Sequence, residues 1–162
     1  MLLVAENGSG EVVGCVHAGP AEHIMETAMQ NAPDAEIRAV LAGFMFLTKL
    51  HGIAVRPDYR GRGVARALLQ RVVEAYTRSG RDLLYGQYTA TEDLGDFYRK
   101  QGFQVPGPGV ALSTLRIFYP NDVAVSNEPG EQIFYRSLQR PADRSWEITR
   151  RARRSQLTEG TR

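Results

Sequence analysis

A short run in the middle of the chain combines a strand, a basic turn with two glycines and the start of a helix. Ile53-Ala54-Val55 is apolar, Arg60-Gly61-Arg62-Gly63 forms the turn, and Val64–Ser79 has the composition of a helix. The first turn of a helix has unpaired amide groups and carries the positive end of the helix dipole. Glycines let an anion approach the backbone closely. The run therefore predicts a phosphate-binding site.

The spacing of the glycines does not identify the phosphate ligand by itself. The strand is not followed by Gly-x-Gly-x-x-Gly, and no Gly-Lys-Ser/Thr is present, so neither common nucleotide-binding loop applies. A buried glycine turn between a strand and a helix, with no ligand, is the alternative.

The length of 162 residues predicts one domain with a substantial core. No apolar run approaches the length of a membrane span, and Met1–Glu6 lacks the basic and apolar regions of a secretion signal. A cytoplasmic location without a membrane partner is expected.

The numbers and positions of cysteine and histidine limit which disulfides, nucleophiles and metal sites are possible. The single Cys15 excludes an internal disulfide and fits a reducing compartment. It lies in the alternating apolar run Val12–Val16, which predicts a buried strand residue rather than a nucleophile. The three histidines are scattered, so no metal site is expected.

The C-terminal region is strongly basic. We expect one domain over residues 1–140 and a basic tail over 141–162, in which only Trp146 and Ile148 offer contacts to the body. A solvated helix or a partly disordered terminus is favoured over a nucleic-acid partner, which is conceivable. The arginines after Gln139 are Arg140, Arg144, Arg150, Arg151, Arg153, Arg154 and Arg162.

Hydrophobic periodicity and turn residues predict a mixed α/β domain with a parallel central pair of strands. The first half predicts a hairpin of Leu2–Ala5 and Val12–His17, then helices over Ala21–Gln30 and Asp34–Leu47. Asp34 is a plausible cap, and Phe44–Leu47 could instead belong to the next strand. The second half predicts strands over Lys49–Val55, Asp82–Tyr88, Leu112–Tyr119 and Gln132–Leu138, with helices over Val64–Ser79 and Glu92–Gln101.

Two motifs, in the expected order, resemble those of the GCN5-related N-acetyltransferases (GNAT). Arg60-x-x-Gly63-x-Ala65 matches the family's acetyl-CoA loop, Arg/Gln-x-x-Gly-x-Gly/Ala, and follows the lead-in Val55-x-Pro57-x-Tyr59. Phe97-Tyr98-x-x-x-Gly102-Phe103 resembles the end of the family's fourth helix. The resemblance covers residues from about Lys49 to Val105. It implies a GNAT fold, with a mixed central sheet, splayed parallel strands and flanking helices.

The resemblance also implies a donor site for acetyl-CoA, with no metal. The backbone of Gly52–Val55, including Ile53, Ala54 and Val55, would pair with the pantetheine arm. The short side chains of Gly52 and Ala54 suit a splay between strands. The pyrophosphate would be held by the amides of Arg60, Gly61, Arg62, Gly63, Val64 and Ala65.

Tyr98 is the expected general acid. In the family this tyrosine points at the thioester sulfur and can protonate the departing thiolate, although a free tyrosine has a pKa of only about 10. The alternative is a packing aromatic beside Phe97 and Phe103. Thr91 stands where the family often has an asparagine that touches the cofactor, so that contact is weaker or absent.

The general base is expected to be His51. Many members carry a glutamate on the fourth strand, but Thr48–His51 contains no carboxylate. Leu50–Val55 resembles the arylalkylamine branch, in which a histidine four residues before the valine helps to draw off the proton through water. A structural histidine is the alternative. Carboxylates near the start of the fourth helix could orient a cationic amine or simply favour the helix dipole: Glu92, Asp93 and Asp96.

The front of the chain departs from the family, which opens with a strand and two helices. Here the two helices lie between the hairpin and the fourth strand. They either replace a wall of the acceptor site, or an N-terminal piece is missing from this chain. The specificity for the acceptor therefore cannot be carried over.

Taken together, these features predict an acetyl-CoA-dependent N-acetyltransferase that acts by direct transfer in a ternary complex. The expected partners are acetyl-CoA and a small primary amine, and a homodimer is compatible with the sequence. The alternatives are a protein acetyltransferase acting on a lysine or an N-terminus, and a non-catalytic acyl-CoA-binding regulatory module. The intact Tyr98 motif argues against the last.

Overall fold

The computed structural model of the chain describes residues 1–31, 37–107, 109–118, 124–139 and 146–149. The strands are β1 (Leu2–Glu6), β2 (Val12–Gly19), β3 (Leu47–Val55), β4 (Leu83–Thr89), β5 (Val110–Leu112), β6 (Glu131–Ser137) and β7 (Glu147–Thr149). The helices are α1 (Glu22–Asn31), α2 (Ile37–Gly43), α3 (Val64–Arg78), α4 (Gly95–Lys100) and α5 (Leu115–Phe118), with a 3-10 turn, η2, at Pro57–Tyr59.

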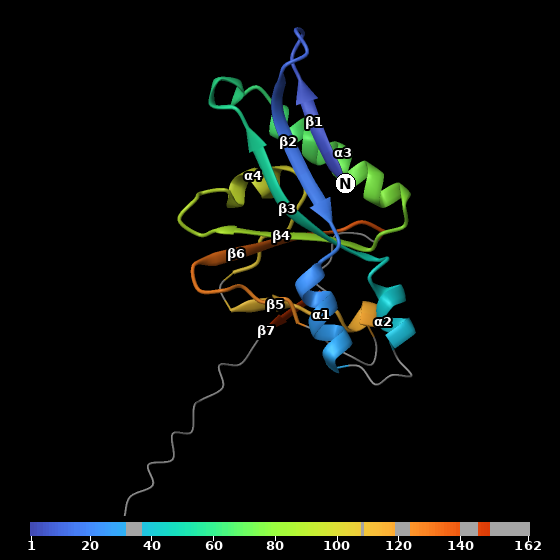
Figure 1. Ribbon diagram of the computed structural model, residues 1–162. Coiled ribbons are helices and arrows are strands. Elements are labelled where there is room, and N and C mark those ends of the chain that lie inside the picture. Colours follow the sequence, from blue (N-terminus) through green and yellow to red (C-terminus); the bar gives the residue numbers. More distant parts are fainter. Residues whose placement is uncertain (32–36, 108, 119–123, 140–145, 150–162) are drawn as a thin grey trace, which may run out of the picture.

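The main sheet has five strands in the order β1-β2-β3-β4-β6, and β5 and β7 form a second, small sheet (Figure 1). Strands β3 and β4 are parallel, whereas the other neighbouring pairs of the main sheet are antiparallel. The predicted mixed α/β fold with a parallel central pair is therefore confirmed.

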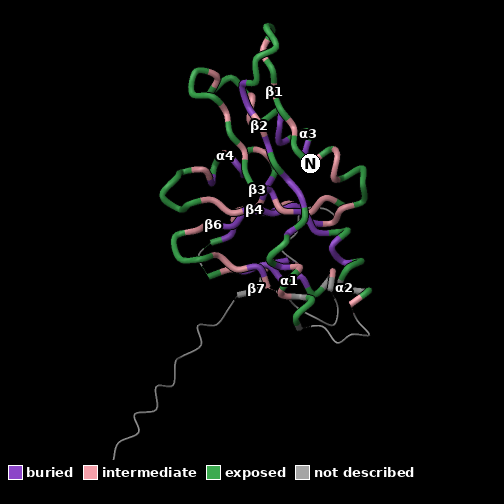
Figure 2. The backbone as a smooth tube through the Cα atoms, in the orientation of Figure 1, coloured by how far each residue is buried: buried purple, intermediate pink, exposed green. Residues whose placement is uncertain are grey.

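Successive residues of β4 point to opposite faces of the sheet and so define two cores. Leu84 packs with α3 and α4 in one core, on what we call the α3 face. Leu83 and Tyr85 pack with α1, β5 and Trp146 in the other core, on the α1 face. Figure 2 shows that burial concentrates in the central strands, whereas the tip of the β1–β2 hairpin and the turn after β3 are exposed.

The amphipathic pattern of α3 explains why it seals one face. Leu68, Leu69 and Val72 are its buried residues and lie on one stripe of the helix. The helix ends before Gly80, whose φ of 75° suits glycine in the left-handed region. The predicted stop at this residue is thus confirmed.

The second helix ends at Gly43 and Leu47 begins β3, so the alternative that this segment joins the next strand is confirmed for Leu47. One predicted strand is wrong in part. The predicted strand Leu112–Tyr119 ends at Leu112 and is followed by α5. Here the Ser113 hydroxyl accepts a hydrogen bond from the Leu115 amide at 3.3 Å, and such local bonds favour a helix start over a strand ladder.

Smaller differences complete the comparison. Helix α4 begins at Gly95 rather than at Glu92. Cys15 lies in β2 as predicted, but it is only half-buried. The proposed cap Asp34 lies outside the described residues.

The packed part of the chain continues past residue 140. Trp146 is 2% exposed and belongs to the core of the α1 face. Strand β7 pairs with β5 in antiparallel register, with Ala111 opposite Ile148. Trp146 and Ile148, the two apolar residues expected to hold the C-terminal region to the body, both lie in this ordered piece. None of the helices in the described ranges is long and apolar enough to cross a membrane.

Candidate active site

The parallel strands β3 and β4 part halfway along their length. Their pairing runs from Leu47 opposite Leu83 to Leu50 opposite Gly86. Beyond this point β3 continues to Val55 beside β2, and β4 continues to Thr89 beside β6. Among the described strands, the end of β3, with Ile53, Ala54 and Val55, therefore has a neighbour on one side only. An extended ligand could pair with its other side.

The turn between β3 and α3 has the backbone needed to hold an anion. Gly61 and Gly63 have φ values of 72° and 82°, which L side chains rarely adopt. A Cβ on either glycine would meet no heavy atom within 4 Å, so space is open around both. Gly63 is the N-cap of α3, and the amides of Val64 and Ala65 have no acceptor within their own helix.

The turn is held by contacts of Tyr59 and carries positive charge. The guanidinium groups of Arg56 and Arg62 lie over the Tyr59 ring, at 5.3 and 5.2 Å from its centroid, and the Tyr59 hydroxyl accepts a hydrogen bond from Asn7 at 3.0 Å. Arg56 pairs with Asp58 at 2.8 Å. Within the described residues, neither Arg60 nor Arg62 pairs with a carboxylate. Both remain available to an anionic ligand.

Tyr98 lies on the α3 face near the place where the strands part. Its ring is 4% exposed and stacks on Phe134 with the centroids 3.6 Å apart. Phe134 in turn packs under Gly86, the last residue of β4 that pairs with β3, and a Cβ at Gly86 would collide with the ring. Tyr98 also shares its core with Leu50 and Ile53 of β3. Burial, the main cause, raises the pKa of Tyr98 to about 12.

His51 lies at a β-bulge on β3. His17 pairs with Gly52 and Ala18 pairs with Leu50, so His51 is the extra residue between them. A bulge re-aims the side chain that it carries. The His51 Nε2 atom lies 3.0 Å from the carbonyl oxygen of Pro20, which can only accept, so Nε2 carries the hydrogen. In the neutral ring Nδ1 is therefore the atom that can take a proton.

The surroundings of His51 favour its neutral form. Its pKa is lowered mainly by partial burial, and the positive charges of His17 and Lys49 lower it further. The bond to Pro20 and the charge of Glu22 act in the opposite direction. The His17 ring stacks on His51 with centroids 4.6 Å apart. A base that is neutral at neutral pH is ready to accept a proton.

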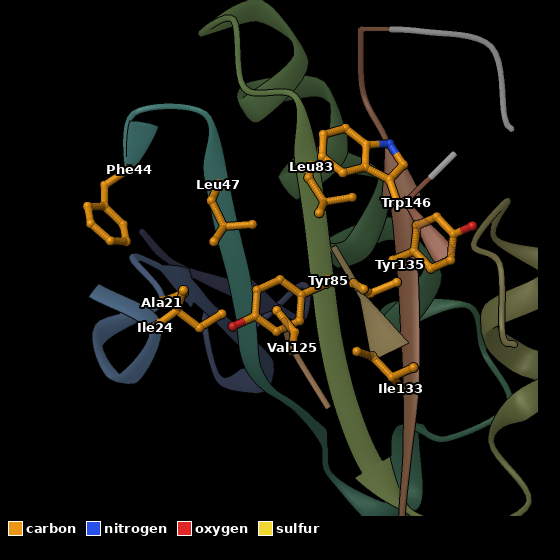
Figure 3. Packing of buried hydrophobic residues seen from close by; sticks show 11 residues of the cluster. Ala21, Ile24, Phe44, Leu47, Leu83, Tyr85, Val125, Ile133, Tyr135 and Trp146 are labelled. Carbon is orange, nitrogen blue, oxygen red and sulfur yellow. The ribbon is translucent and has the colours of Figure 1, made fainter. Parts of the chain in front are cut away.

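A cavity of about 440 Å³ opens beside His51 on the α1 face. Figure 3 shows Tyr85 reaching from β4 with its hydroxyl directed toward Ile24 of α1. The lining residues come from α1, β3, β4, β6 and the segment before β6. The polar ones are Glu22, His23, Thr27, Lys49, His51, Tyr85, Gln87, Ser126, Glu128 and Glu131.

The carboxylates of this cavity are not those suggested by the sequence. Glu92, Asp93 and Asp96 do not line it, and Asp96 pairs instead with Arg99 at 2.9 Å. Glu128 and Glu131 lie in a part of the chain without a motif, so only the tertiary fold brings them to the site. Tyr85 could have been expected only as one apolar residue of a buried strand.

Parallel strands that part beside a basic glycine turn are the arrangement that the resemblance implies for an acetyl-CoA-dependent acyltransferase. A model of the acetyltransferase (GNAT) domain matches residues 1–105. The chain belongs to this family, and the resemblance of its two motifs is confirmed. An uncharacterized N-acetyltransferase of Methanocaldococcus jannaschii is 33% identical over 60 residues, which are 36% of this chain and 26% of that protein. That match thus spans about a quarter of the relative's length.

Solved acetyltransferases share the fold. Phosphinothricin acetyltransferase of Sinorhizobium meliloti, in complex with acetyl-CoA, matches with a TM-score of 0.55 and 18% identity over 85% of this chain and 60% of that chain. The yncA protein of Salmonella typhimurium, with its cofactor acetyl-CoA, has a TM-score of 0.53 and 17% identity, over 88% of this chain and 66% of that chain. Ribosomal-protein-alanine N-acetyltransferase of Brucella melitensis has a TM-score of 0.51 and 22% identity, over 85% of this chain and 68% of that chain. At such identities the likeness concerns the fold alone.

Proposed function

We propose that this protein is an N-acetyltransferase that moves an acetyl group from acetyl-CoA to a primary amine of a small molecule, directly and within a ternary complex. The observation that carries the proposal is the parting of β3 and β4 after Leu50 and Gly86, between the basic turn and Tyr98. This opening connects an anion site at one end to a candidate acid at the other.

The donor fits the residues around the opening. The pantetheine arm pairs with the free side of β3 at Ile53–Val55 and takes the place of a strand. The pyrophosphate accepts hydrogen bonds from the amides between Arg60 and Ala65, where two glycines of positive φ leave the backbone open. The guanidinium groups of Arg60 and Arg62, which pair with no carboxylate of the described residues, add electrostatic attraction.

The acceptor occupies the cavity on the α1 face. The cavity volume of about 440 Å³, between α1, the central strands and the segment before β6, is in the range of small-molecule sites. The amine must lose a proton to attack, and Nδ1 of neutral His51 takes it through a water molecule.

The transfer then needs no covalent enzyme intermediate. The amine nitrogen bonds to the thioester carbon, the carbon–sulfur bond breaks, and the sulfur leaves with the bonding pair. The Tyr98 hydroxyl donates its proton to that thiolate. Its pKa of about 12 makes it a weaker acid than free tyrosine, so the contribution falls at the low end of general acid catalysis.

The test is the release of coenzyme A thiol from acetyl-CoA over a panel of small primary amines and lysine-containing peptides. We expect turnover with at least one small amine, and Tyr98→Phe should slow it without weakening acetyl-CoA binding. Turnover with peptides only would make the protein a protein acetyltransferase. Binding of acetyl-CoA without turnover of any amine would make it a non-catalytic acyl-CoA-binding module.

A further inference from the structure

The charges around the acceptor cavity are separated in space. Lys49 and His51 lie on β3, at the side where the strands part. Glu131 begins β6, and Glu128 lies just before it, so these carboxylates are at the opposite side of the cavity. Glu22 of α1 also lines the cavity, and its charge acts on His51. Lys49 and Glu22 thus offset each other near the expected reaction centre, whereas Glu128 and Glu131 leave the other side negative.

The negative side is fixed in place. One carboxylate oxygen of Glu131 accepts a hydrogen bond from the Gln87 side chain at 2.9 Å and another from the Glu128 amide at 3.2 Å. Gln87 also donates to the Ser126 carbonyl at 3.2 Å. Within the described residues, no lysine or arginine pairs with Glu128 or Glu131. Their negative charge is available to a ligand.

A buried polar group between the two sides points to the same ligand space. Tyr85 is 2% exposed, lines the cavity, and directs its hydroxyl toward Ile24 (Figure 3). Its hydroxyl makes no hydrogen bond to another described residue. Burial raises the pKa of this phenol, which stays neutral and can both donate and accept. A hydroxyl that opens into the cavity from an otherwise buried side chain is placed to bond a ligand there.

We propose that the acceptor is a diamine, which reacts through one nitrogen beside His51 while Glu128 and Glu131 hold its second nitrogen as an ammonium ion. This inference rests on the proposed function and adds the class of acceptor. Tyr85 lies on β4, between the two sides of the cavity, and contacts the alkyl spacer of the diamine or its nearer nitrogen.

The charge gradient suits the two different tasks of the two nitrogens. Near Lys49 a positive charge is less favoured than near Glu128 and Glu131, so the reacting amine loses its proton more readily than the second amine does. Near Glu128 and Glu131 a positive charge is favoured. Strands β3 and β6 are separated by β4, and Glu131 pairs with Thr89, four residues along β4 from the Tyr85 that pairs with Lys49. The backbones of the two sides are therefore farther apart than two strand spacings, about 10 Å. An alkyl spacer between the nitrogens, together with the side chains that reach into the cavity from both sides, can bridge this span.

Three acceptors of matched length distinguish the possibilities: pentylamine with one ammonium, diaminopentane with two, and aminohexanoate with an ammonium and a carboxylate. Thiol release should give diaminopentane a kcat/KM about tenfold or more above pentylamine. A preference for aminohexanoate would overturn the proposal, since Lys49 would then bind a carboxylate. Equal values for the diamine and the monoamine would overturn it as well.

Calorimetry with diaminopentane and pentylamine separates this inference from the function on which it rests. Tighter binding of the diamine without any thiol release would retain the cavity assignment and reject the catalytic proposal. Thiol release from other amines, without binding of diaminopentane, would retain the catalytic proposal and reject the diamine as acceptor.

The variant Glu128→Gln locates the second ammonium. It should raise the KM for diaminopentane about tenfold and leave that for pentylamine unchanged. Glu26→Gln is the matched control, because Glu26 is an exposed glutamate of α1 that does not line the cavity. Equal effects of Glu128→Gln on both amines would contradict the assignment.

Discussion

The two faces of the central sheet are built in different ways. On the α3 face, Tyr98, Phe134 and Phe103 pack ring against ring under a long amphipathic helix. On the α1 face, short helices leave a cavity lined by charged and hydroxyl groups. The α3 face carries the two motifs of the family and the α1 face carries none.

This difference separates what the protein shares with its family from what is its own. Donor binding needs a backbone conformation and a packed wall, which recur with few residue types. Recognition of an acceptor needs particular side chains in a cavity, and here α1 and α2 lie between the hairpin and β3 instead of in front of the hairpin. We therefore expect changes on the α3 face to affect the donor and the chemistry, and changes on the α1 face to affect the amine.

The largest effect is expected at the glycine turn. Gly63→Val places a branched side chain at a φ of 82° and into the space of the phosphate. Losing two hydrogen bonds to a charged ligand, at about 1.5–3 kcal/mol each, should weaken acetyl-CoA binding by about a hundredfold or more. Calorimetry measures the affinity. Gly80→Val is the control, because Gly80 has a φ of 75° and open space at the other end of α3. Equal losses in both variants would mean damage to the fold.

Tyr98→Phe tests the chemistry of the α3 face. Phenylalanine keeps the stack on Phe134 but removes the proton that the sulfur receives. We expect kcat to fall about a hundredfold, the low end of general acid catalysis, with acetyl-CoA affinity unchanged. A variant that turns over its amine at the wild-type rate, with chemistry limiting, would make Tyr98 a packing residue.

Gly86→Ala tests whether the wall behind Tyr98 is as tightly packed as its rings indicate. The added Cβ would press on the Phe134 ring, and overpacking of this kind costs about 1–3 kcal/mol of unfolding free energy. Denaturant unfolding gives the value. Gly52→Ala is the matched control within β3, where a Cβ meets no heavy atom within 4 Å. Equal unfolding free energies of the two variants would show that the Phe134 ring can move to accommodate the added Cβ.

His51→Gln tests the base on the α1 face. Glutamine can keep the bond to the Pro20 carbonyl but cannot take a proton. Because the pKa of His51 is lowered from 6.5, activity through a neutral ring should be complete at neutral pH and fall only in more acidic solution. The variant should lose this acid limb and run about tenfold slower at neutral pH, since solvent can replace part of the base. An unchanged pH profile would assign the proton to solvent alone.

The smallest effect is expected for Tyr85→Phe. It removes one neutral hydrogen bond, about 0.5–1.5 kcal/mol, so the KM for the amine should rise roughly two- to tenfold. Both kcat and the acetyl-CoA affinity should stay as they are, the opposite of the pattern for Tyr98→Phe. A change in kcat alone would remove Tyr85 from acceptor binding.

The sequence predicts the donor half of the protein well, because local rules decide it. The strand, the glycine turn and α3 follow from Gly61, Gly63 and the apolar stripe of α3, and each is where the pattern predicts it. Periodicity failed at Leu112–Tyr119, where Ser113 and Thr114 start a helix inside an apolar run.

The acceptor half could not be predicted in the same way. The bulge at His51 arises from the register in which β2 pairs with β3. This register depends on tertiary pairing and cannot be deduced from the sequence of either strand. Glu128 and Glu131 reach the cavity only through the antiparallel pairing of β6 with β4. Tyr85 reads as apolar in a strand, yet its hydroxyl faces the cavity.

A crystal structure with acetyl-CoA tests the donor site most directly. We expect the pyrophosphate on the amides between Arg60 and Ala65, the pantetheine arm along β3 between the parted strands, and the thioester sulfur facing the Tyr98 hydroxyl. The carbonyl carbon should open toward the cavity beside His51. Acetyl-CoA bound away from the gap between β3 and β4, or with its sulfur turned from both Tyr98 and the cavity, would contradict the proposed enzyme.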